Sequence, residues 1–312
     1  MSATRVPCPI CKRGSSEAYS VIDGHPYYAC EACGSIHVSP ALLDAIDAGN
    51  APVGEYVEDY WEQERVGAEE RAAGVSLCRA GEAILYCRRP VQRFLDVGAG
   101  PGFLLRNLES LLDPQGDTFH GIEKFPPAYA ARTRNYHEGG IEDLAGTKFD
   151  AGVCIEVVEH LTPRMFDGIA AGLARVSAPG AFWLFNTGMP DYVRNEDPGY
   201  LDPVRRGHIV SYSLEAAAMI MEPHGFHVGR LPGKSFAFFA EYQPEAAIDF
   251  DERIYRALEA NSALLQRHGL LYHAAFESAR SYLYYAGYLE RTAWALSLQA
   301  AAEPTRRSGA EP

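Results

Sequence analysis

Residues 94–105 read FLDVGAGPGFLL, and this stretch decides the fold. An apolar run typical of a buried strand ends near an acidic residue, Asp96, and the chain then passes Gly98, Gly100 and Gly102 into an apolar helical pattern. Glycine is needed where backbone passes close beneath a ligand, because a Cβ would be in the way. The stretch therefore predicts a strand, a ligand-binding turn and a helix.

The glycine spacing is G-x-G-x-G, which differs from that of a dinucleotide site. A dinucleotide fingerprint needs a small residue three places after its second glycine, and Phe103 stands there in this chain. A pyrophosphate site at the start of the helix is therefore disfavoured. An ordinary strand–helix turn without a ligand is the alternative.

A second acidic residue, Glu123, ends the next predicted strand in FHGIEKFPP. A carboxylate at that point can accept both ribose hydroxyl protons of a nucleoside. The two signals together, hhDxGxGxG followed by hhxhE, resemble class I S-adenosylmethionine-dependent methyltransferases of the small-molecule type 11 and type 23 kinds. The resemblance covers roughly residues 60–242.

This resemblance implies S-adenosyl-L-methionine as the cofactor. The glycine loop would lie under its methionine part, with Asp96 orienting the amino group, and Glu123 would bind the ribose. The family's third motif commonly reads G-D-A-E-D-L, whereas residues 139–144 read GGIEDL, so that Gly140 replaces the acid near the adenine. That contact passes to the Ile141 backbone or the Glu142 side chain. The implied cofactor-binding residues are Asp96, Gly98, Ala99, Gly100, Gly102, Glu123, Lys124, Ile141, Glu142 and Glu156.

Around this stretch, residues 91–242 alternate short apolar runs with helical stretches, the pattern of a parallel sheet covered on both faces. The predicted fold class is α/β, a Rossmann-like, doubly wound, mostly parallel seven-stranded sheet. The strands that we predict are Arg93–Val97, Thr118–Ile122, Ala151–Ile155, Ala181–Asn186, His227–Leu231 and Phe236–Tyr242.

The rest of the chain divides around this core. We expect a zinc ribbon at 1–40, a linker and lead-in helix at 41–90 (the helix from about Glu69 to Cys87), the core at 91–242, a helical extension at 243–300 and a disordered tail at 301–312. Apolar residues recur at helical spacing over Ser281–Leu296. That face is expected to be a packing surface or to form a homodimer.

Four cysteines near the N-terminus form two C-x2-C pairs, Cys8 with Cys11 and Cys30 with Cys33, separated by eighteen residues. This spacing is typical of a four-thiolate zinc ribbon, in which each turn presents two sulfur donors to tetrahedral zinc. Four unrelated buried thiols are the alternative. Basic and acidic residues balance over 1–40, whereas a nucleic-acid ribbon should be basic. We therefore expect a structural zinc ion here, and a structural or substrate-covering role for the ribbon that it holds.

Residues 149–161, FDAGVCIEVVEHL, predict the fourth strand and the start of its helix. Glu156, Glu159 and His160 then share one helical face at i, i+3 and i+4, and His208 follows in the motif GHIVSYS. In small-molecule methyltransferases such residues line the site without a metal, and His160 or His208 is then the candidate general base.

The alternative for the same four residues is a second metal site. In small-RNA 2′-O-methyltransferases and ubiquinone-pathway O-methyltransferases a similar E-x-x-E-H with a distant histidine holds a divalent ion. Glu156, Glu159, His160 and His208 would suit Mg, Mn, Fe or Zn, and the ion would lower the pKa of a substrate hydroxyl. Both interpretations stay open at this stage.

Three aromatic residues, Tyr56, Tyr60 and Trp61, precede the core. They are expected either to stack on a sugar or ring of the substrate or to anchor the ribbon to the sheet.

Composition narrows the function further. The chain has 312 residues, 47% hydrophobic and 22% charged, with a formal charge of −13. An acidic chain without a basic block is a poor binder of long RNA or DNA. No apolar run reaches the roughly 18 residues of a membrane helix, and the N-terminus lacks the apolar stretch of a secretory signal, so a cytoplasmic protein is expected.

The order of ribbon and core looks like that of bacterial methyltransferases of secondary metabolism and surface saccharides. We therefore predict a methyltransferase for a small-molecule acceptor, methylating oxygen or carbon. An RNA methyltransferase and a non-catalytic zinc scaffold are the alternatives. The identity of the acceptor is beyond the sequence.

Overall fold

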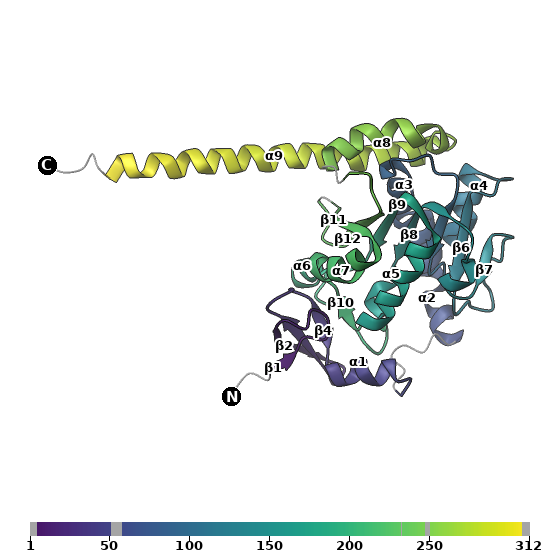
Figure 1. Cartoon of the computed structure of the whole chain (residues 1–312), viewed down its shortest axis with the longest axis horizontal. Coiled ribbons are helices and arrows are strands. Elements are labelled where there is room, and N and C mark those ends of the chain that lie inside the picture. Colours follow the sequence, from purple (N-terminus) through teal and green to yellow (C-terminus); the bar gives the residue numbers. More distant parts are fainter. Residues whose placement is uncertain (1–4, 51–57, 232, 247–249, 308–312) are drawn as a thin grey trace.

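The computed structural model describes residues 5–50, 58–231, 233–246 and 250–307. Two sheets organise them, a five-stranded sheet at the N-terminal end and a seven-stranded sheet in the body of the molecule (Figure 1). Helices surround the larger sheet, and one long helix projects away from it.

The seven-stranded sheet has the strand order β11-β12-β9-β8-β5-β6-β7. The pairs from β9 to β7 are parallel, and β12 runs antiparallel to both of its neighbours. This confirms the α/β class and the mostly parallel seven-stranded sheet. Each of the six predicted strands overlaps an observed one, while β7 was not predicted. The strands are β5 (Phe94–Val97), β6 (Phe119–Glu123), β7 (Tyr136–Glu138), β8 (Phe149–Ile155), β9 (Ser177–Asn186), β11 (Phe226–Arg230) and β12 (Ala237–Tyr242).

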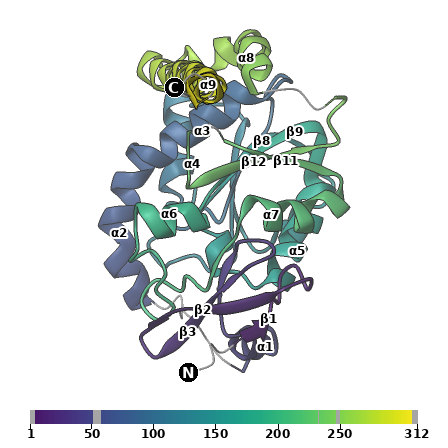
Figure 2. The same ribbon diagram turned by 90° about the vertical axis from the view of Figure 1, so that its left-hand side faces the viewer.

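Helices cover both faces of this sheet (Figure 2). Successive side chains of a strand point to opposite faces, so β9 sends Phe182 and Leu184 into one apolar core and Trp183 and Phe185 into the other. The first core is closed by α3 (Val75–Tyr86), α4 (Phe103–Leu112), α8 (Phe250–Leu265) and α9 (Gly269–Arg307), and the second by α5 (Pro163–Val176) and α7 (Leu214–Met221).

The lead-in region differs from the prediction. Instead of one helix from Glu69 to Cys87, two helices, α2 (Glu58–Ala73) and α3, meet at Gly74. Gly74 has φ −119° and ψ −102°, which is not helical, and glycine is a poor helix former. A shorter helix, α1 (Pro40–Asp47), lies upstream, with the Ser39 side chain capping its first turn.

The N-terminal sheet has the order β1-β2-β3-β4-β10, and its pairs are antiparallel. Four strands come from the ribbon, but the fifth, β10, comes from the core segment that carries His208. The strands are β1 (Arg5–Pro7), β2 (Ser15–Ile22), β3 (His25–Cys30), β4 (Ile36–Val38) and β10 (Val210–Ser211). The ribbon is thus built into the body of the protein by sheet hydrogen bonds.

The C-terminal helices are fixed to the sheet by a buried ion pair. Arg253 of α8 is fully buried, its guanidinium lies 2.5 Å from the Glu241 carboxylate on β12, and its Cζ atom lies 5.0 Å from the ring centroids of both Phe182 and Phe239. Beyond this contact α9 projects from the body (Figure 1) and continues to Arg307, past Ala300, where we expected a disordered tail to begin. The alanine-rich sequence there favours a helix. Residues 308–312 lie outside the described part.

The described helices include none that is long and apolar enough to span a bilayer.

Candidate functional site

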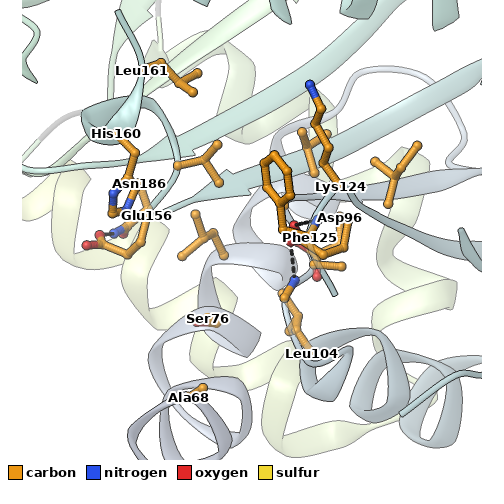
Figure 3. Close-up of a pocket in the computed structure, with 18 of the residues that line it drawn as sticks. Ala68, Ser76, Asp96, Leu104, Lys124, Phe125, Glu156, His160, Leu161 and Asn186 are labelled. Atoms are coloured by element: carbon orange, nitrogen blue, oxygen red, sulfur yellow. Dashed lines mark hydrogen bonds between the residues drawn. The ribbon is translucent and has the colours of Figure 1, made fainter. Parts of the chain in front are cut away.

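A cavity of about 1080 Å³ opens at the carboxyl ends of the central strands. The chain leaves β5 toward β6 on one side and β8 lies on the other, so this edge is the point where the strand order reverses, at which ligands of open α/β sheets bind. Figure 3 shows Asp96 and Lys124 on one side of the cavity and Glu156, Asn186 and His160 on the other. This volume is large enough for a small-molecule ligand.

The glycine loop forms the floor of the cavity between β5 and α4. Gly98, Gly100 and Gly102 all have positive φ, at 73°, 51° and 75°, a conformation that other residues rarely adopt. A Cβ at Gly98 would lie 2.5 Å from the Val157 side chain, and one at Gly102 would lie 3.0 Å from a backbone oxygen. Glycine is therefore required here both for its conformation and for lack of space.

Asp96 is a buried carboxyl group at the edge of this loop. It lines the cavity, and no hydrogen bond or ion pair from the described residues reaches its side chain. Burial first, and the nearby Glu123 carboxylate second, raise the pKa of Asp96 to about 7. Such a group is stabilised by a cationic ligand, because only the ionised form gains from the new charge.

Glu123 is held differently. One of its oxygens accepts the Gly100 N–H and the other accepts the Phe125 N–H, each at 2.8 Å. The carboxylate is thereby fixed at the end of β6 and lines the cavity, with one further lone pair on each oxygen. It can accept two hydrogen bonds from a ligand without moving. Lys124 beside it also lines the cavity.

The GGIEDL segment forms the short helix η1 (Ile141–Leu144), where the Asp143 carboxylate accepts the Gly140 N–H at 2.9 Å. Ile141 is buried and, with Glu142, lines the cavity. A Cβ at Gly140 would lie 2.3 Å from a Glu142 carboxylate oxygen. The Glu142 carboxylate therefore occupies the space in which a side chain at position 140 would lie.

The EVVEH segment does not start a helix as we expected. Glu156 has φ +54°, a strained value outside glycine, and Val158–His160 forms one turn of 3-10 helix, η2. The helix α5 begins only at Pro163, with the Thr162 side chain capping it. Proline lacks an N–H and belongs in the first turn of a helix, so the Thr-Pro pair sets the start of α5.

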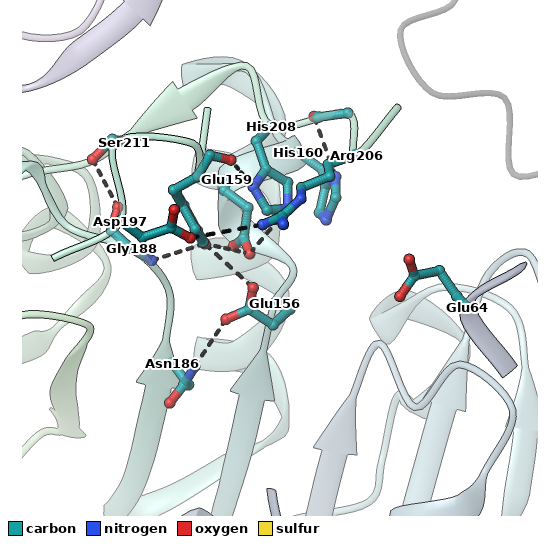
Figure 4. A network of polar contacts seen from close by, with 12 residues as sticks. Glu64, Glu156, Glu159, His160, Asn186, Gly188, Asp197, Arg206, His208 and Ser211 are labelled. Atoms are coloured by element: carbon teal, nitrogen blue, oxygen red, sulfur yellow. Dashed lines mark hydrogen bonds and ion pairs between the residues drawn. The ribbon is translucent and has the colours of Figure 1, made fainter. Parts of the chain in front are cut away.

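The turn nevertheless brings three of the four predicted residues together. The ligand atoms of Glu159, His160 and His208 all lie within 4.8 Å of one another, and His208 comes from a segment far along the chain (Figure 4). Glu156 is not one of these three but lies next to Glu159, since the Tyr200 hydroxyl contacts both carboxylates, and it accepts a hydrogen bond of 2.9 Å from Asn186. Burial first, and the charge of Glu159 second, raise the pKa of Glu156 well above its ordinary value.

Hydrogen bonds to backbone carbonyl oxygens determine which ring nitrogen of His160 and of His208 carries the proton. The Nδ1 atom of His208 lies 2.7 Å from the Tyr200 carbonyl oxygen, and Nδ1 of His160 lies 3.2 Å from that of Gly207. A carbonyl oxygen only accepts, so each Nδ1 carries the proton and each neutral ring has a lone pair on Nε2. Burial lowers the pKa of both, that of His208 to about 3, and both rings stay neutral near pH 7.

Several site residues were not predicted. The Tyr200 hydroxyl accepts the Gly188 N–H and donates to Glu159, both at 2.8 Å, and Asn186 ends β9 beside Glu156. The other Glu159 oxygen is buried, and no hydrogen-bond partner for it lies in the described chain. Tyr200 stands in a loop, where the sequence carries no periodic signal; Asn186 was detectable as the last residue of a predicted strand.

Of the three aromatic residues that precede the core, Trp61 is the one whose side chain the structure describes. Trp61 lines the cavity, and its ring would lie 3.5 Å from a Cβ at Gly100. It belongs to a face of α2 that also brings Glu64, Ala68 and Arg71 to the cavity. Tyr56 and the Tyr60 side chain lie outside the described part.

The four N-terminal cysteines form a separate, buried cluster. Their sulfur atoms lie within 4.8 Å of one another, 3.9 Å between Cys8 and Cys33 and 3.7 Å between Cys11 and Cys30. Four sulfurs around a tetrahedral zinc ion are about 3.8 Å apart, given a Zn–S bond of about 2.3 Å. All four are free thiols. The donor set and its spacing therefore fit zinc.

The two cysteine turns share one backbone geometry. Lys12 follows Cys11 with φ +55°, and Gly34 follows Cys33 with φ +75°. The Lys12 N–H donates to the Cys8 carbonyl oxygen at 3.2 Å, just as the Gly34 N–H donates to the Cys30 carbonyl oxygen at 2.9 Å. Each turn thus requires a left-handed backbone conformation after its second cysteine. Gly34 adopts it without strain, whereas Lys12 in the first turn does not.

No protein-family model and no curated protein matches the chain. Among solved structures, similarity is found to an O-methyltransferase family protein from Burkholderia thailandensis (14% identity, TM-score 0.45, 59% of this chain and 60% of that one). It is also found to human N-acetylserotonin methyltransferase in complex with SAM (13%, 0.44, 64% and 65%) and to the mitomycin 7-O-methyltransferase MmcR (18%, 0.42, 58% and 59%). The chain spans about 60% of the length of the first and third of these proteins. Values this low assign neither a family nor an activity.

Proposed function

We propose that this protein is an S-adenosylmethionine-dependent methyltransferase that acts on a small molecule, at oxygen or carbon. The observation that carries the proposal is the pair of carboxyl groups, Asp96 and Glu123, on either side of a bare glycine loop in one cavity. One carboxyl needs a cation, and the other is fixed to accept two hydrogen bonds. An amino-acid-bearing nucleoside has both features.

The residues present fit this cofactor. Asp96 would hold the ammonium group, the loop Gly98-Ala99-Gly100 with Gly102 would lie under the methionine part, and Glu123 would accept the ribose hydroxyls. S-adenosylmethionine, when bound, supplies an electrophilic methyl group on its sulfonium. The chain contributes alignment of the acceptor and exclusion of water, which is the main source of rate in positioning-dominated catalysis.

At the adenine end of the cofactor, the proposed contact is made by Glu142. Its carboxylate occupies the space that an acid at position 140 would enter, and the buried Ile141 beside it supplies an apolar surface and a backbone N–H. We therefore propose that Glu142 accepts the adenine amino group in place of the missing acid. Glu142→Ala should weaken cofactor binding, and adding Gly140→Asp to that variant should restore part of it.

The acceptor end contains Glu156, His160 and His208. Both imidazoles present an Nε2 lone pair, so either can take a proton from an acceptor hydroxyl. The same lone pairs, with the buried and partly unpartnered Glu159 carboxylate, also fit a divalent cation, since metal-binding histidines usually donate their other N–H to a backbone oxygen. A cation bound there would lower the pKa of the acceptor hydroxyl.

These two alternatives differ in a simple measurement. If a cation is bound, purified protein contains a second metal besides zinc, and it is lost in a Glu159→Gln variant. If a histidine acts alone, metal content is unaffected by Glu159→Gln, and turnover is insensitive to removal of weakly held divalent ions.

For the four cysteines we propose a structural zinc ion. Four buried thiolates within 4.8 Å of one another would repel each other, and a cation at their centre would relieve this repulsion. No residue of the described part of the ribbon lines the cavity, which disfavours the substrate-covering role that we considered from the sequence.

The oligomeric state is also a proposal. Tyr284, Tyr288 and Trp294 of α9 are exposed, and α9 projects from the body (Figure 1). We propose that two copies of the chain associate through these side chains, which sedimentation of the wild type and of a Trp294→Ala variant would test.

The function is tested by calorimetric titration with S-adenosylmethionine and its demethylated product. We expect micromolar affinity for the wild type, and a loss of about tenfold or more in Glu123→Gln, because a hydrogen-bonded carboxylate contributes about 1.5–3 kcal/mol. Glu138→Gln is the matched control, since Glu138 faces Glu123 on the neighbouring strand and does not line the cavity. An unaltered affinity in Glu123→Gln would remove the basis of the proposal.

The acceptor class follows from labelled methyl transfer into cell extract. Label in the acid-soluble small-molecule fraction supports the proposal, whereas label that is released only by ribonuclease supports the RNA alternative.

A further inference from the structure

The segment that carries His208 lies between two structures, the site and the ribbon. On the site side, the Ile209 N–H donates to the Glu159 carbonyl oxygen at 2.9 Å, and His160 Nδ1 lies 3.2 Å from the Gly207 oxygen. The segment is thereby bonded to the turn that holds the other two residues of the Glu159–His160–His208 group.

On the ribbon side, the same few residues are bonded again. The Val38 N–H donates to the Ile209 oxygen at 3.0 Å, and β10 then pairs with β4, Val210 opposite His37 and Ser211 opposite Ile36. The hydroxyl of Tyr27, on β3, donates to the carbonyl oxygen of His208 itself at 2.6 Å. One side of the His208 backbone is therefore held by the ribbon.

The link reaches the cysteine cluster directly. The Ser213 hydroxyl donates to the carbonyl oxygen of Cys33, and the Ser213 N–H donates to the Ser35 hydroxyl at 3.0 Å. Tyr27 lies on the strand that ends at Cys30. The second cysteine turn is thus joined by two short connections to residues 208 and 213.

These contacts are shielded from water. Tyr27 and Val210 have exposed fractions of 0%, and His208 one of 5%. Water cannot replace the lost partner of a buried hydrogen bond, so breaking such a bond leaves a carbonyl group without a partner. Separating the His208 segment from the ribbon therefore costs free energy, so we expect the segment to move with the ribbon.

We propose that the metal-loaded ribbon sets the position of His208, with Tyr27 as the positioning residue that joins them. No described residue of the ribbon lines the cavity, but the ribbon determines the position of His208, which does line it. Loss of the metal loosens β3 and β4, and His208 loses its place beside Glu159 while the glycine loop and the two carboxyl groups stay in position. Metal occupancy of the ribbon thus regulates turnover without regulating cofactor binding; the catalytic part of this inference rests on the proposed function.

The ribbon depends on its metal because it is small. Its strands are three to eight residues long, and a unit of this size does not build a sufficient core alone. The core sheet has no such dependence. The same metal removal therefore has a local effect, and this is what makes the coupling detectable.

The test uses the full-length zinc-loaded protein with isotope-labelled histidine, the His208 signal being assigned with a His208→Gln variant. Tyr27→Phe keeps the buried ring and removes the hydroxyl. We expect the His208 ring signal to shift, kcat to fall on the order of tenfold, and the affinity for S-adenosylhomocysteine to stay unchanged. Tyr19→Phe, at an exposed position of the same ribbon, should alter none of these.

Removal of zinc from the wild type with a chelator is the second arm, and it does not depend on the folding of a variant. The same His208 shift, with cofactor affinity retained, supports the proposal. An unmoved His208 signal after zinc removal contradicts it, and so does unfolding of the whole core, because the ribbon would then act on global stability. If the wild type binds no cofactor, the methyltransferase assignment fails, but the His208 signal still reports the coupling.

Discussion

The ribbon and the seven-stranded sheet are held together by different forces. In the ribbon, short strands surround four buried cysteines whose sulfurs lie within 4.8 Å of one another. In the sheet, large apolar side chains such as Trp183, Phe185 and Phe238 are fully buried between helices on both faces. With the zinc ion that we propose, the first region would depend on a metal ion as well as on the apolar core that it shares with the sheet, and the second on apolar packing.

This difference separates two tasks. The sheet places Asp96 and Glu123, the residues that we propose for the cofactor, near the ends of β5 and β6, where burial and, for Glu123, two backbone hydrogen bonds fix them. The ribbon shares a sheet with β10 and fixes the neighbourhood of His208. On our proposal, loss of the metal would displace His208 and leave Asp96 and Glu123 in position.

The largest effect is expected from breaking the cysteine cluster. Cys30→Ser removes one of four donors, and structural zinc contributes on the order of 10 kcal/mol to the folding of such units. We expect loss of zinc and rapid hydrogen exchange across β1–β4, with slow exchange kept in β5 and β8. Metal analysis and exchange mass spectrometry check this.

Cys78→Ser is the control, because Cys78 is outside the cluster and half-buried. Retained zinc and protected ribbon amides in Cys30→Ser would show that the ribbon does not depend on the metal.

The converse change weakens the sheet. Phe185 stacks on Phe238 with ring centroids 4.7 Å apart and is fully buried. Phe185→Ala should lower the free energy of unfolding by about 3–5 kcal/mol. Zinc content should not change, since the ribbon is held by its own donors. Denaturant titration with metal analysis measures both, and zinc loss in parallel with the core would contradict the separation.

A smaller effect concerns Asp96. Its pKa is raised to about 7 in the folded protein, so the folded state binds this proton more tightly than the unfolded state does. Stability from this group is therefore full at low pH and falls as the pH rises from about 4 to about 7. Asp96→Asn removes this loss and should raise the free energy of unfolding at pH 8 by on the order of 2 kcal/mol.

Cofactor binding should follow the opposite course. The affinity of the wild type for S-adenosylhomocysteine should rise up to about tenfold between pH 6 and pH 8, because the ammonium group needs ionised Asp96. Asp96→Asn should bind more weakly and without this pH dependence. A pH-independent affinity in the wild type would mean that Asp96 does not meet the charge.

The smallest effect is a gain in the ribbon. Lys12 adopts φ +55°, the conformation that Gly34 supplies in the second turn. Lys12→Gly should relieve strain and stabilise the zinc-loaded ribbon by about 0.5–1 kcal/mol. Competition with a zinc indicator measures this as a several-fold tighter zinc affinity. A weaker affinity would indicate that the lysine side chain contributes to the turn.

The sequence predicted features that local patterns specify. The alternation of apolar runs placed six strands of the larger sheet, and cysteine spacing placed four sulfurs that the structure brings together. β7 and β10 escaped because strands of three and two residues show no periodicity. Gly74 divides the lead-in helix into two. Glycine is a helix-breaking residue, but the prediction of one continuous helix did not take it into account.

The site was predicted in composition but not in geometry. Glu159, His160 and His208 meet through a strained turn at Glu156 and through β10, and neither feature follows from a helical face. Tyr200 and Asn186 complete the hydrogen bonds around Glu156 and Glu159. Tyr200 comes from a loop that meets the turn only in the folded chain, so no local pattern reveals it, whereas Asn186 is the last residue of a predicted strand.

The most direct measurement is a crystal structure of the zinc-loaded protein with S-adenosylhomocysteine at saturating concentration. We predict the ligand over Gly98–Gly102, with its ammonium group against Asp96, its ribose hydroxyls on Glu123 and its adenine beside Ile141 and Glu142. A cavity that stays empty under these conditions, or a ligand bound with its ribose away from Glu123, would contradict the account.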